Sequence, residues 1–354
     1  MQVSVVILLT NRCNKHCPYC FMANGRDNLS YALLSKALKS LCGRPDPEST
    51  DANYSIVFMG GEPLLNFKVL KKSVALLRKM IPQTRLRCRV VTNGSLLRQR
   101  QKLKWFRENP DVQVAVSTDD VKMLEGIDIP QLSAKVILTP ENVSVLADRI
   151  IDIAKRGIFV ECTLADGVDW TAKSRAPLRM FFKKVQEFFC HNAALPPPDI
   201  LSAAVWTVHE RREGCRPGVT SFCVDAHGTL HSCERETPDF NRKSFKLIYD
   251  IQSPPELFPK KCASCRLRNL CSICPAVKAS IRTRDQAVIK CLYVHEAIAA
   301  SVSYLSNLAI RVSSGALKRR ECHFLASRPK LSIALLAKGC YDTGNILIDE
   351  RMPR

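Results

Sequence analysis

The sequence predicts an α/β fold of parallel strand–helix units, followed by a small cysteine-rich segment. Two observations carry this prediction. Short runs of β-branched residues alternate with segments of helical apolar spacing, and the density of cysteines rises sharply beyond residue 210. With 354 residues, the chain is long enough for one large domain and a smaller one.

The individual elements follow from local patterns. Six short apolar runs are expected to be strands: Val3–Leu9, Ser55–Met59, Arg87–Val91, Val112–Ser117, Lys135–Leu138 and Phe159–Leu164. Five segments have the apolar spacing of helices: Tyr31–Leu41, Asn66–Met80, Leu96–Arg107, Val143–Lys155 and Ala176–Phe189. Pro130 interrupts Asp119–Leu132, which we expect to be a short helix or a loop.

Three consecutive prolines, Pro196 to Pro198, follow the last of these helices and mark a change of architecture. We therefore predict a first domain over residues 1–195 and a cysteine-rich domain over residues 196–300. Tyr293–Leu308 again has helical spacing, and residues 301–354 form a helical and basic carboxyl-terminal tail.

Composition restricts the class of protein. The amino terminus lacks the basic start of a signal peptide, and we see no uninterrupted apolar run of membrane-spanning length, so a cytoplasmic protein without a membrane partner is expected. Seventeen cysteines in a reducing compartment favour metal or cluster ligation over disulfides. The net charge of +20 is compatible with nucleic acid, an acidic peptide or an anionic cofactor as partner.

The first cysteine motif lies directly after the first predicted strand. Cys13, Cys17 and Cys20 have the spacing C-x3-C-x2-C, so three thiolates on one loop can converge on one 4Fe-4S cluster. Three ligands leave one iron open to a cofactor or substrate. A zinc knuckle is the alternative, but zinc sites typically pair two separate cysteine hairpins.

The segment CNKHCPYC resembles the signature of the radical S-adenosylmethionine (SAM) superfamily, including the aromatic Tyr19 before the third cysteine. The residues Gly60, Gly61, Glu62 and Pro63 resemble that family's GGE motif after the second strand. The resemblance implies that Tyr19 lies beside the adenine of SAM. It also implies that Glu62, with nearby backbone, accepts hydrogen bonds from the ammonium group of SAM.

Two later strand ends resemble further motifs of the family: Thr92-Asn93-Gly94 and Ser117-Thr118-Asp119. The resemblance implies a partial (β/α)6 TIM-like barrel, with Asn93, Ser117 and Asp119 among the SAM contacts at its mouth. It also implies the reaction: an electron enters the cluster, the sulfonium bond of SAM breaks, and a 5'-deoxyadenosyl radical abstracts a hydrogen atom from the substrate.

A second cysteine array resembles the SPASM domain, which holds auxiliary iron–sulfur clusters in many radical SAM enzymes. Its members are Cys215, Cys223, Cys233, Cys262, Cys265, Cys271, Cys274 and Cys291. The resemblance implies one 4Fe-4S cluster on Cys215, Cys223, Cys233 and Cys274, and a second on the other four. The array departs from the family once, because two residues separate Cys271 from Cys274 where three are usual. Two zinc sites are the alternative.

Some titratable residues lie near these motifs. An acidic residue after the cysteine corresponding to Cys233 can act as a base in sulfatase-maturing relatives, which makes Glu234 the candidate for that role; a solvated surface carboxylate is the alternative. We interpret His16, His227 and His231 as solvated loop residues.

The resemblance implies a maturase that forms a crosslink in a peptide or protein, epimerises it or oxidises it. The alternatives are formylglycine formation of the sulfatase-maturase kind, dehydrogenation of a small alcohol or amino sugar, and, from another class, a zinc-ribbon protein that binds nucleic acid. The predicted partners are a peptide or protein substrate and an electron donor of the flavodoxin or ferredoxin type. Either a separate leader-binding protein presents the peptide, or the auxiliary domain and the basic tail recognise it directly. Nucleic acid is not an expected partner of the enzyme.

Overall fold

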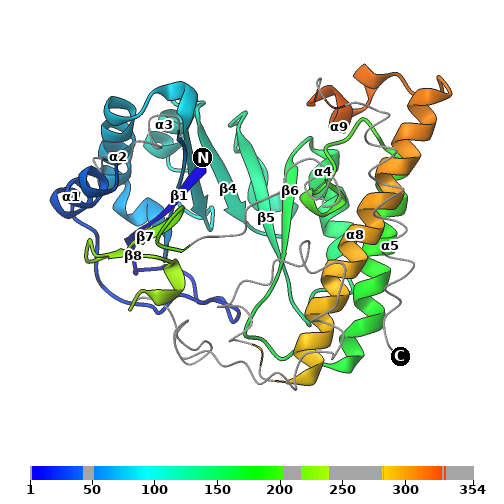
Figure 1. Cartoon of the computed structure of the whole chain (residues 1–354), viewed down its shortest axis with the longest axis horizontal. Coiled ribbons are helices and arrows are strands. Elements are labelled where there is room, and N and C mark those ends of the chain that lie inside the picture. The colour runs from blue at the N-terminus through cyan, green and yellow to red at the C-terminus, as the bar shows by residue number, and fades with distance from the viewer. Residues whose placement is uncertain are drawn as a thin grey trace. The chain divides into compact units, whose positions relative to one another are not determined.

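The computed structural model describes residues 2–42, 52–202, 217–238, 281, 283–328 and 331, and Figure 1 shows their elements. The chain forms two compact units. The first comprises Met1–Thr118, Lys122–Ser133 and Cys215–Ile251; the second comprises Asp119–Val121, Ala134–Gly214 and Gln252–Arg354. Segments from both sides of residue 195 contribute to each unit, so the domain boundary predicted there stays a prediction.

The first unit is built on a twisted sheet. Its strands are β1 (Gln2–Thr10), β2 (Asn53–Gly60), β3 (Leu86–Thr92), β4 (Val112–Ser117), β7 (Ser221–Val224) and β8 (Leu230–His231). They lie in the order β4-β3-β2-β1-β7-β8. The first four strands and β7 pair in parallel, and β8 closes the edge antiparallel to β7.

Three helices connect the parallel strands of the first unit: α1 (Tyr31–Cys42), α2 (Phe67–Met80) and α3 (Arg100–Glu108). Parallel neighbours require such crossovers. Val5 and Ile7 of β1, and Ile56 and Phe58 of β2, are almost completely buried, which follows from the two-residue period of a strand. The carboxyl ends of four strands therefore meet at one edge of the sheet, where the predicted site residues follow.

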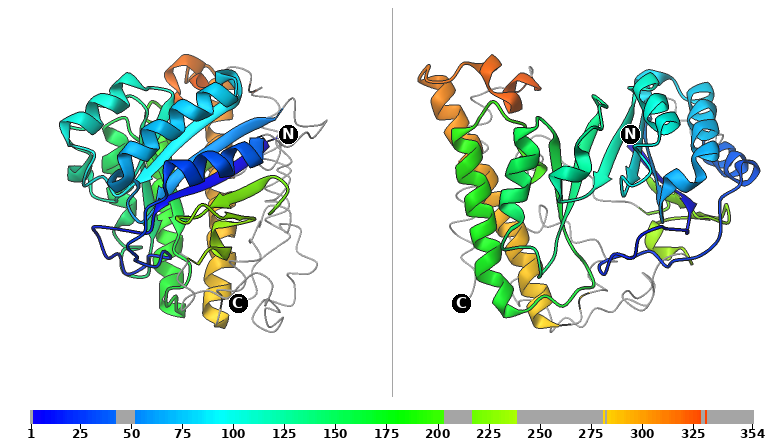
Figure 2. Two further views of the ribbon diagram at one scale, coloured as in Figure 1. Left: turned by 90° about the vertical axis from the view of Figure 1, so that its left-hand side faces the viewer. Right: turned by 180° about the vertical axis from the view of Figure 1, so that it is seen from behind.

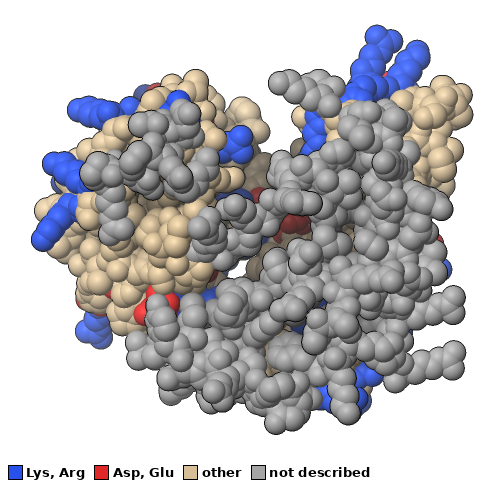
Figure 3. All heavy atoms as spheres, in the orientation of Figure 1, with Lys and Arg blue, Asp and Glu red and all other residues tan. Residues whose placement is uncertain are grey.

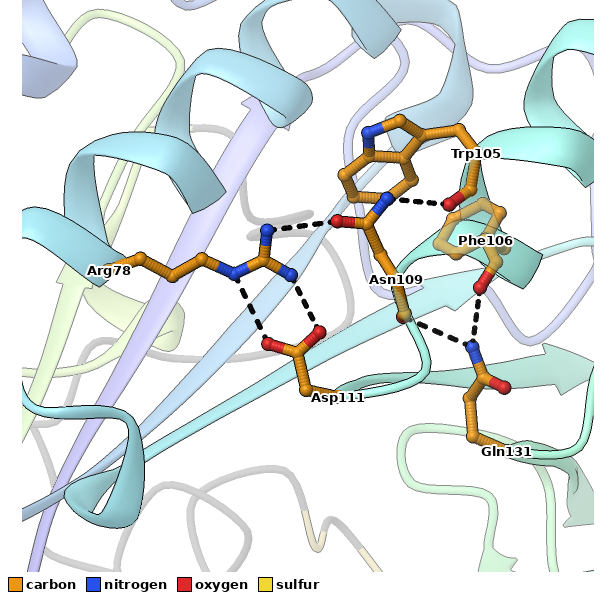
Figure 4. Close-up of polar contacts among 6 residues, drawn as sticks. All are labelled: Arg78, Trp105, Phe106, Asn109, Asp111 and Gln131. Atoms are coloured by element: carbon orange, nitrogen blue, oxygen red, sulfur yellow. Dashed lines mark hydrogen bonds and ion pairs between the residues drawn. The ribbon is translucent and has the colours of Figure 1, made fainter.

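A polar cluster fixes the end of α2 to the turn before β4 (Figure 4). The guanidinium of Arg78 donates from Nε and Nη2 to both oxygens of Asp111, at 3.2 and 2.6 Å, and from Nη1 to Asn109 Oδ1 at 2.9 Å. Asn109 in turn donates to the carbonyl of Trp105 at the end of α3, at 2.7 Å. These bonds hold α2 and α3 side by side on the sheet.

The second unit contains β5 (Leu132–Leu138) from Ala134 onward, β6 (Phe159–Leu164), α4 (Leu146–Lys155), α5 (Arg175–His191), α8 (Arg284–Ser313) and α9 (His323–Ala326). Helices α5 and α8 run side by side (Figure 2). The rings of Phe182 and Tyr293 meet edge to face at 5.5 Å, and Arg175 pairs with Asp285 at 2.8 Å. A capping box of Thr283 and Gln286 begins α8.

Helix α8 is long and apolar enough, by length and composition, to qualify as a membrane span, with a mean hydropathy of 1.2 over the segment concerned. Within the second unit, however, it is a core helix. Leu292, Leu305 and Leu308 are buried, and the Tyr293 hydroxyl donates to the carbonyl of Cys162 at 2.9 Å. Packing against α5 accounts for its apolar residues.

The predicted elements agree closely with the structure. β4 and β6 have the predicted bounds, and the Asp119–Leu132 segment contains a short 3-10 turn, Val121–Leu124, before β5 begins at Leu132. α3 begins at Arg100 instead of Leu96, because Gly94 has a positive φ and its carbonyl accepts the Leu97 N–H in a turn. α8 extends well beyond the predicted Tyr293–Leu308.

Candidate cluster and SAM site

The cysteine loop follows the carboxyl end of β1. Cys13 and Cys17 are half-buried and Cys20 is exposed, and a turn closes between Cys20 N–H and Cys17 O at 3.0 Å. Beyond Cys20 the loop is anchored by Met22, which is buried in a cluster with Leu8 of β1 and Cys223 of β7. The thiols thus lie on a loop that is attached to the sheet at both ends.

The GGE segment runs directly along the start of this loop. Gly61 N–H donates to Thr10 O, and Glu62 N–H donates to Arg12 O, both at 2.8 Å. A Cβ on Gly60 would lie 2.2 Å from Thr10 O, and one on Gly61 would lie 2.1 Å from Arg12 O. Both positions therefore require glycine, because any side chain would drive the two loops apart.

The carboxylate of Glu62 holds the ends of β2 and β3 together. One oxygen accepts from the Leu64 N–H at 3.0 Å and the Thr92 hydroxyl at 2.7 Å, and the other accepts from the Asn93 N–H at 2.7 Å. The residue is fully buried. Burial raises its pKa, and the hydrogen bonds from Asn93, Thr92 and Leu64 oppose that rise. The sequence did not reveal this structural role, and contact between Glu62 and SAM stays a prediction.

Asn93 connects the end of β3 to the cysteine loop. Its side-chain amide donates to Asn14 Oδ1 at 2.8 Å and lies 3.9 Å from Cys13 Sγ. Its side-chain oxygen accepts from the Ser95 N–H at 3.0 Å, and the Ser95 hydroxyl accepts from the Asn14 amide at 2.8 Å. Lys15 Nζ donates to the Asn93 carbonyl at 3.3 Å. The structure thus brings Cys13, Glu62 and Asn93 together.

Cys13, Cys17 and Cys20 supply three thiols on one loop, which is the donor set that a 4Fe-4S cluster takes. Partial burial of the Cys20 thiol raises its pKa, a backbone hydrogen bond from Met22 opposes that rise, and the nearby Cys17 and Cys13 add to it. In the part of the chain that the structure describes, no three His, Cys, Asp or Glu side chains converge on one ion position. A cubane binds each thiolate through a different iron, so its ligands need not converge on one point.

The remaining predicted SAM contacts are Tyr19, Ser117 and Asp119. Tyr19 is half-buried within the cysteine loop, and Ser117 is half-buried at the end of β4. Asp119 belongs to the second unit, where its carboxylate accepts from Arg149 at 2.5 Å and from Asn142 at 3.5 Å. An ion pair within that unit thus already uses the Asp119 carboxylate, and SAM contact at these three residues stays a prediction.

Three of the eight predicted auxiliary ligands lie among the described residues. Cys223 is completely buried in β7, and Cys233 is buried after β8. The Cys233 thiol donates to the half-buried carboxylate of Glu234 at 3.5 Å. Cys291 is half-buried in α8 of the second unit. Five lie outside the described residues: Cys215, Cys262, Cys265, Cys271 and Cys274. The auxiliary ligand sets therefore stay predictions.

The turn between β7 and β8 contains a buried carboxylate that sequence reasoning missed. Asp225 accepts from the N–H groups of His227 and Thr229 at 2.9 and 2.8 Å, and its other oxygen lies 2.8 Å from His231 Nε2. The sequence signal was an aspartate three residues before Gly228, which has a positive φ. These bonds fix the hairpin that carries Cys223 and leads into Cys233.

The cysteines without an assigned ligand role are small buried side chains where the structure describes them. Cys88, Cys162, Cys190 and Cys322 are all buried, as free cysteines commonly are. Burial raises the pKa of the Cys88 thiol to about 12. The side chain of Cys42 and all of Cys340 lie outside the described residues.

Part of the chain matches known proteins in sequence. Residues 7–160 match the model of the radical SAM superfamily. An uncharacterised protein of Methanocaldococcus jannaschii is 28% identical over 123 residues, which are 34% of this chain and 39% of that protein. The match thus spans well under two thirds of the relative's length.

Two solved structures share the fold. Native anSMEcpe with bound AdoMet and Cp18Cys peptide has a TM-score of 0.63 at 15% identity, covering 90% of this chain and all of that chain. Native anSMEcpe with bound AdoMet and Kp18Cys peptide has a TM-score of 0.61 at 15% identity, covering 89% of this chain and again all of that chain. At this identity the likeness establishes the fold.

Proposed function

Because this protein is a radical SAM enzyme, with the superfamily's domain over residues 7–160, we propose that it cleaves SAM reductively and modifies a peptide or protein substrate. The observation that carries the proposal is the junction of three loops at one sheet edge. The GGE loop bonds to the start of the cysteine loop through Thr10 and Arg12, and Asn93 bonds to that loop through Asn14.

In this proposal Cys13, Cys17 and Cys20 hold a 4Fe-4S cluster that has one open iron for SAM. Bound there, the cluster supplies one electron and SAM supplies the 5'-deoxyadenosyl group that takes a hydrogen atom from the substrate. The chain's own residues position these groups. Gly60 and Gly61 allow the close approach of the two loops, and Glu62 fixes the backbone of Asn93 beside Cys13.

We infer a peptide or protein substrate from the fold and from the second cysteine array. The solved structures of anSMEcpe that share the fold contain AdoMet and a peptide. The eight cysteines suffice for two auxiliary clusters that accept or deliver electrons. Glu234 is our candidate for the base that removes a substrate proton, because its carboxylate is half-buried and lies beside Cys233.

Anaerobic purification followed by reduction with dithionite tests the first part of the proposal. We expect a brown protein that converts SAM to 5'-deoxyadenosine, detected by chromatography and mass spectrometry. A colourless zinc protein that leaves SAM intact would contradict it.

The substrate class needs a separate experiment. Candidate peptides encoded beside the gene are incubated with the enzyme and SAM, and their masses are measured. Peptides deuterated at the reacting carbon are expected to transfer deuterium to 5'-deoxyadenosine. Deuterium transfer from a small alcohol or amino sugar, and none from any peptide, would favour the dehydrogenase alternative.

A further inference from the structure

Lys15 is a half-buried cation inside the cysteine loop, between Cys13 and Cys17. Its backbone N–H donates to Cys13 Sγ at 3.4 Å, and its Nζ donates to the carbonyl of Asn93 at 3.3 Å. The side-chain amide of Asn93 lies 3.9 Å from the same sulfur. The backbone and the side chain of Lys15 are therefore both held in the surroundings of the Cys13 thiol.

The charge of Lys15 is not neutralised by a direct ion pair among the described residues of the site. The cysteine loop, residues 13–20, contains no Asp or Glu. Burial raises the pKa of Glu62, and Lys15 opposes that rise, but it does so less than the hydrogen bonds to that carboxylate. Those three bonds already occupy both Glu62 oxygens. The positive charge of Lys15 is thus left to act on the thiols of its own loop.

The position of Lys15 differs from that of the cations on the surface. Many Lys and Arg side chains extend from the molecule into solvent (Figure 3), where water and dissolved salt screen their charges. A half-buried ammonium with a fixed hydrogen bond is screened much less, so its field at a neighbouring thiolate is stronger. Lys15 can therefore respond to a change of charge at Cys13 more strongly than a surface lysine can.

A cluster on the three cysteines of this loop is sensitive to such a charge. The thiolates make the site anionic, and reduction adds one more negative charge to it. Positive charge and N–H groups near the ligand sulfurs stabilise the reduced state more than the oxidised state, which raises the reduction potential. Cys13 accepts from the Lys15 N–H, and Asn93 joins its sulfur to the Lys15 ammonium.

We propose that the Lys15 ammonium, held on the Asn93 carbonyl, raises the reduction potential of the cluster site and so allows a one-electron reductant to reduce it. This inference rests on the proposed function, because it requires a cluster on the three cysteines. The step transfers one electron from the reductant to the site; no bond forms or breaks and no proton moves.

The loop has other attachments, so the Lys15 side chain is not needed to hold it. The GGE segment donates two backbone hydrogen bonds of 2.8 Å to the start of the loop. The side chain of Asn14 accepts from the Asn93 amide, also at 2.8 Å. The bond from Lys15 Nζ is longer, at 3.3 Å. Removal of the ammonium therefore changes the charge of the site and leaves the loop attached.

The test uses the full-length enzyme, reconstituted anaerobically, with Lys15→Met as the variant. Methionine keeps an unbranched side chain and removes the charge, whereas Lys15→Arg keeps the charge. Lys79→Met is the control for net charge, because Lys79 is exposed in the last turn of α2. That turn lies where the parallel strands begin, at the opposite edge of the sheet from the cysteine loop.

The fraction of reduced cluster is measured by electron paramagnetic resonance at a series of fixed potentials, without SAM. The signal of the first cluster is the one that Cys17→Ala lacks. We expect Lys15→Met to lower the ratio of reduced to oxidised cluster about tenfold, which is a shift of about 59 mV to lower potential for a one-electron couple. Lys15→Arg and Lys79→Met should stay within about twofold of the unmodified enzyme. Iron content should be equal in all of these proteins.

An unchanged potential in Lys15→Met would overturn the proposal, and weaker SAM binding beside it would assign the ammonium to SAM instead. An equal shift in Lys15→Arg or in Lys79→Met would also overturn it, since loop geometry or net charge would then be the cause. Loss of the first cluster from Lys15→Met would contradict it too, because Lys15 would then be needed to assemble the site. Failure of the proposed function has a different signature: the unmodified enzyme would leave SAM intact even with dithionite, whatever the potentials of the Lys15 variants.

Discussion

At the scale of single residues, the site depends on a few side chains with several partners each. The Glu62 carboxylate accepts three hydrogen bonds from two strand ends while completely buried. The side-chain nitrogen of Asn93 donates to Asn14 of the cysteine loop, and its side-chain oxygen accepts from the N–H of Ser95, so this one amide joins the end of β3 to that loop and fixes the turn that follows. Such groups are costly to alter, because removal of one acceptor leaves buried donors unsatisfied.

Replacement of Glu62 by Gln is expected to weaken the junction of β2 and β3. The glutamine amide nitrogen has to face a donor, the N–H of Asn93 or of Leu64, so at least one hydrogen bond is lost. We expect a loss of about 1–3 kcal/mol in the free energy of unfolding, measured by urea denaturation, together with weaker SAM binding. An unchanged denaturation midpoint would mean that these bonds contribute little.

Replacement of Cys17 by Ala is expected to abolish SAM cleavage while auxiliary iron stays bound. The protein should lose roughly four irons, those of one cubane, as measured by colorimetric iron assay. Cys88→Ala is the control, since Cys88 is buried in β3 and should leave the iron content intact. Loss of all iron from the Cys17 variant would instead mean that the clusters assemble as one cooperative unit.

Cys88 also yields a pH prediction. Its pKa is raised to about 12 by burial, so the thiol stays protonated in the folded chain while an unfolded thiol ionises near pH 8.5. Only the thiolate reacts with iodoacetamide. Peptide mass spectrometry should therefore find Cys88 unmodified at about pH 9 in native protein and rapidly modified in urea. Rapid labelling of the native protein would show that β3 opens readily.

At the scale of elements, the site is a contact between loops that follow adjacent parallel strands. β1 and β2 pair along their length until the register shifts between Leu8 and Thr10. The shift brings Gly60 and Gly61 against the backbone of Thr10 and Arg12. The cysteine loop is thus positioned by backbone hydrogen bonds as much as by its own side chains.

Replacement of Gly60 by Ala is expected to separate the GGE and cysteine loops. The new Cβ meets the Thr10 carbonyl, and the positive φ of Gly60 adds backbone strain. Gly126→Ala is the matched control, because Gly126 also has a positive φ but has no atom within 4 Å of the added Cβ. We expect Gly60→Ala to cost about 1–3 kcal/mol more than the control, measured by urea denaturation. Equal costs would show that the loop moves without penalty.

At the scale of the whole molecule, charge and cysteines are unevenly distributed. The basic residues of α1, α2 and α3 contrast with the mixed helices of the second unit. The predicted auxiliary ligands are divided between the two units, since Cys223 and Cys233 belong to the first and Cys291 to the second. An auxiliary cluster assembled from such an array would link segments far apart in the chain.

The iron content of the whole protein tests the second array. Three 4Fe-4S clusters predict about twelve irons per chain in protein reconstituted anaerobically, and Cys291→Ser is expected to lower that number by about four. Cys322→Ser is the control, because Cys322 is buried in the second unit outside both arrays. A value of about four irons in the unmodified protein would mean that only the first cluster forms.

Local sequence patterns were enough to predict most of the elements. The β-branched runs predicted the bounds of β4 and β6 as the structure has them. Such a prediction succeeds because the periodicity of a strand depends on neighbouring residues. Errors came where a turn intervened, as at the start of α3, or where tertiary packing lengthened an element, as in α8. The apolar spacing after Leu96 does not show the turn that Gly94 makes before α3. The apolar spacing of Tyr293–Leu308 does not show that α5 packs along α8.

The sequence by itself determined the cysteine loop, the GGE segment and their order after successive strands. The spacing of a motif and the alternation of strands with helices are both local properties of the sequence. Only the tertiary structure decided which partners these residues have. It assigned the Glu62 carboxylate to Thr92 and Asn93 and paired Asp119 with Arg149. It also placed Lys72 of α2 over Tyr31 of α1 and Lys102 of α3 over Phe67 of α2. Such partners are distant in sequence and become neighbours only when parallel strands place their carboxyl ends side by side.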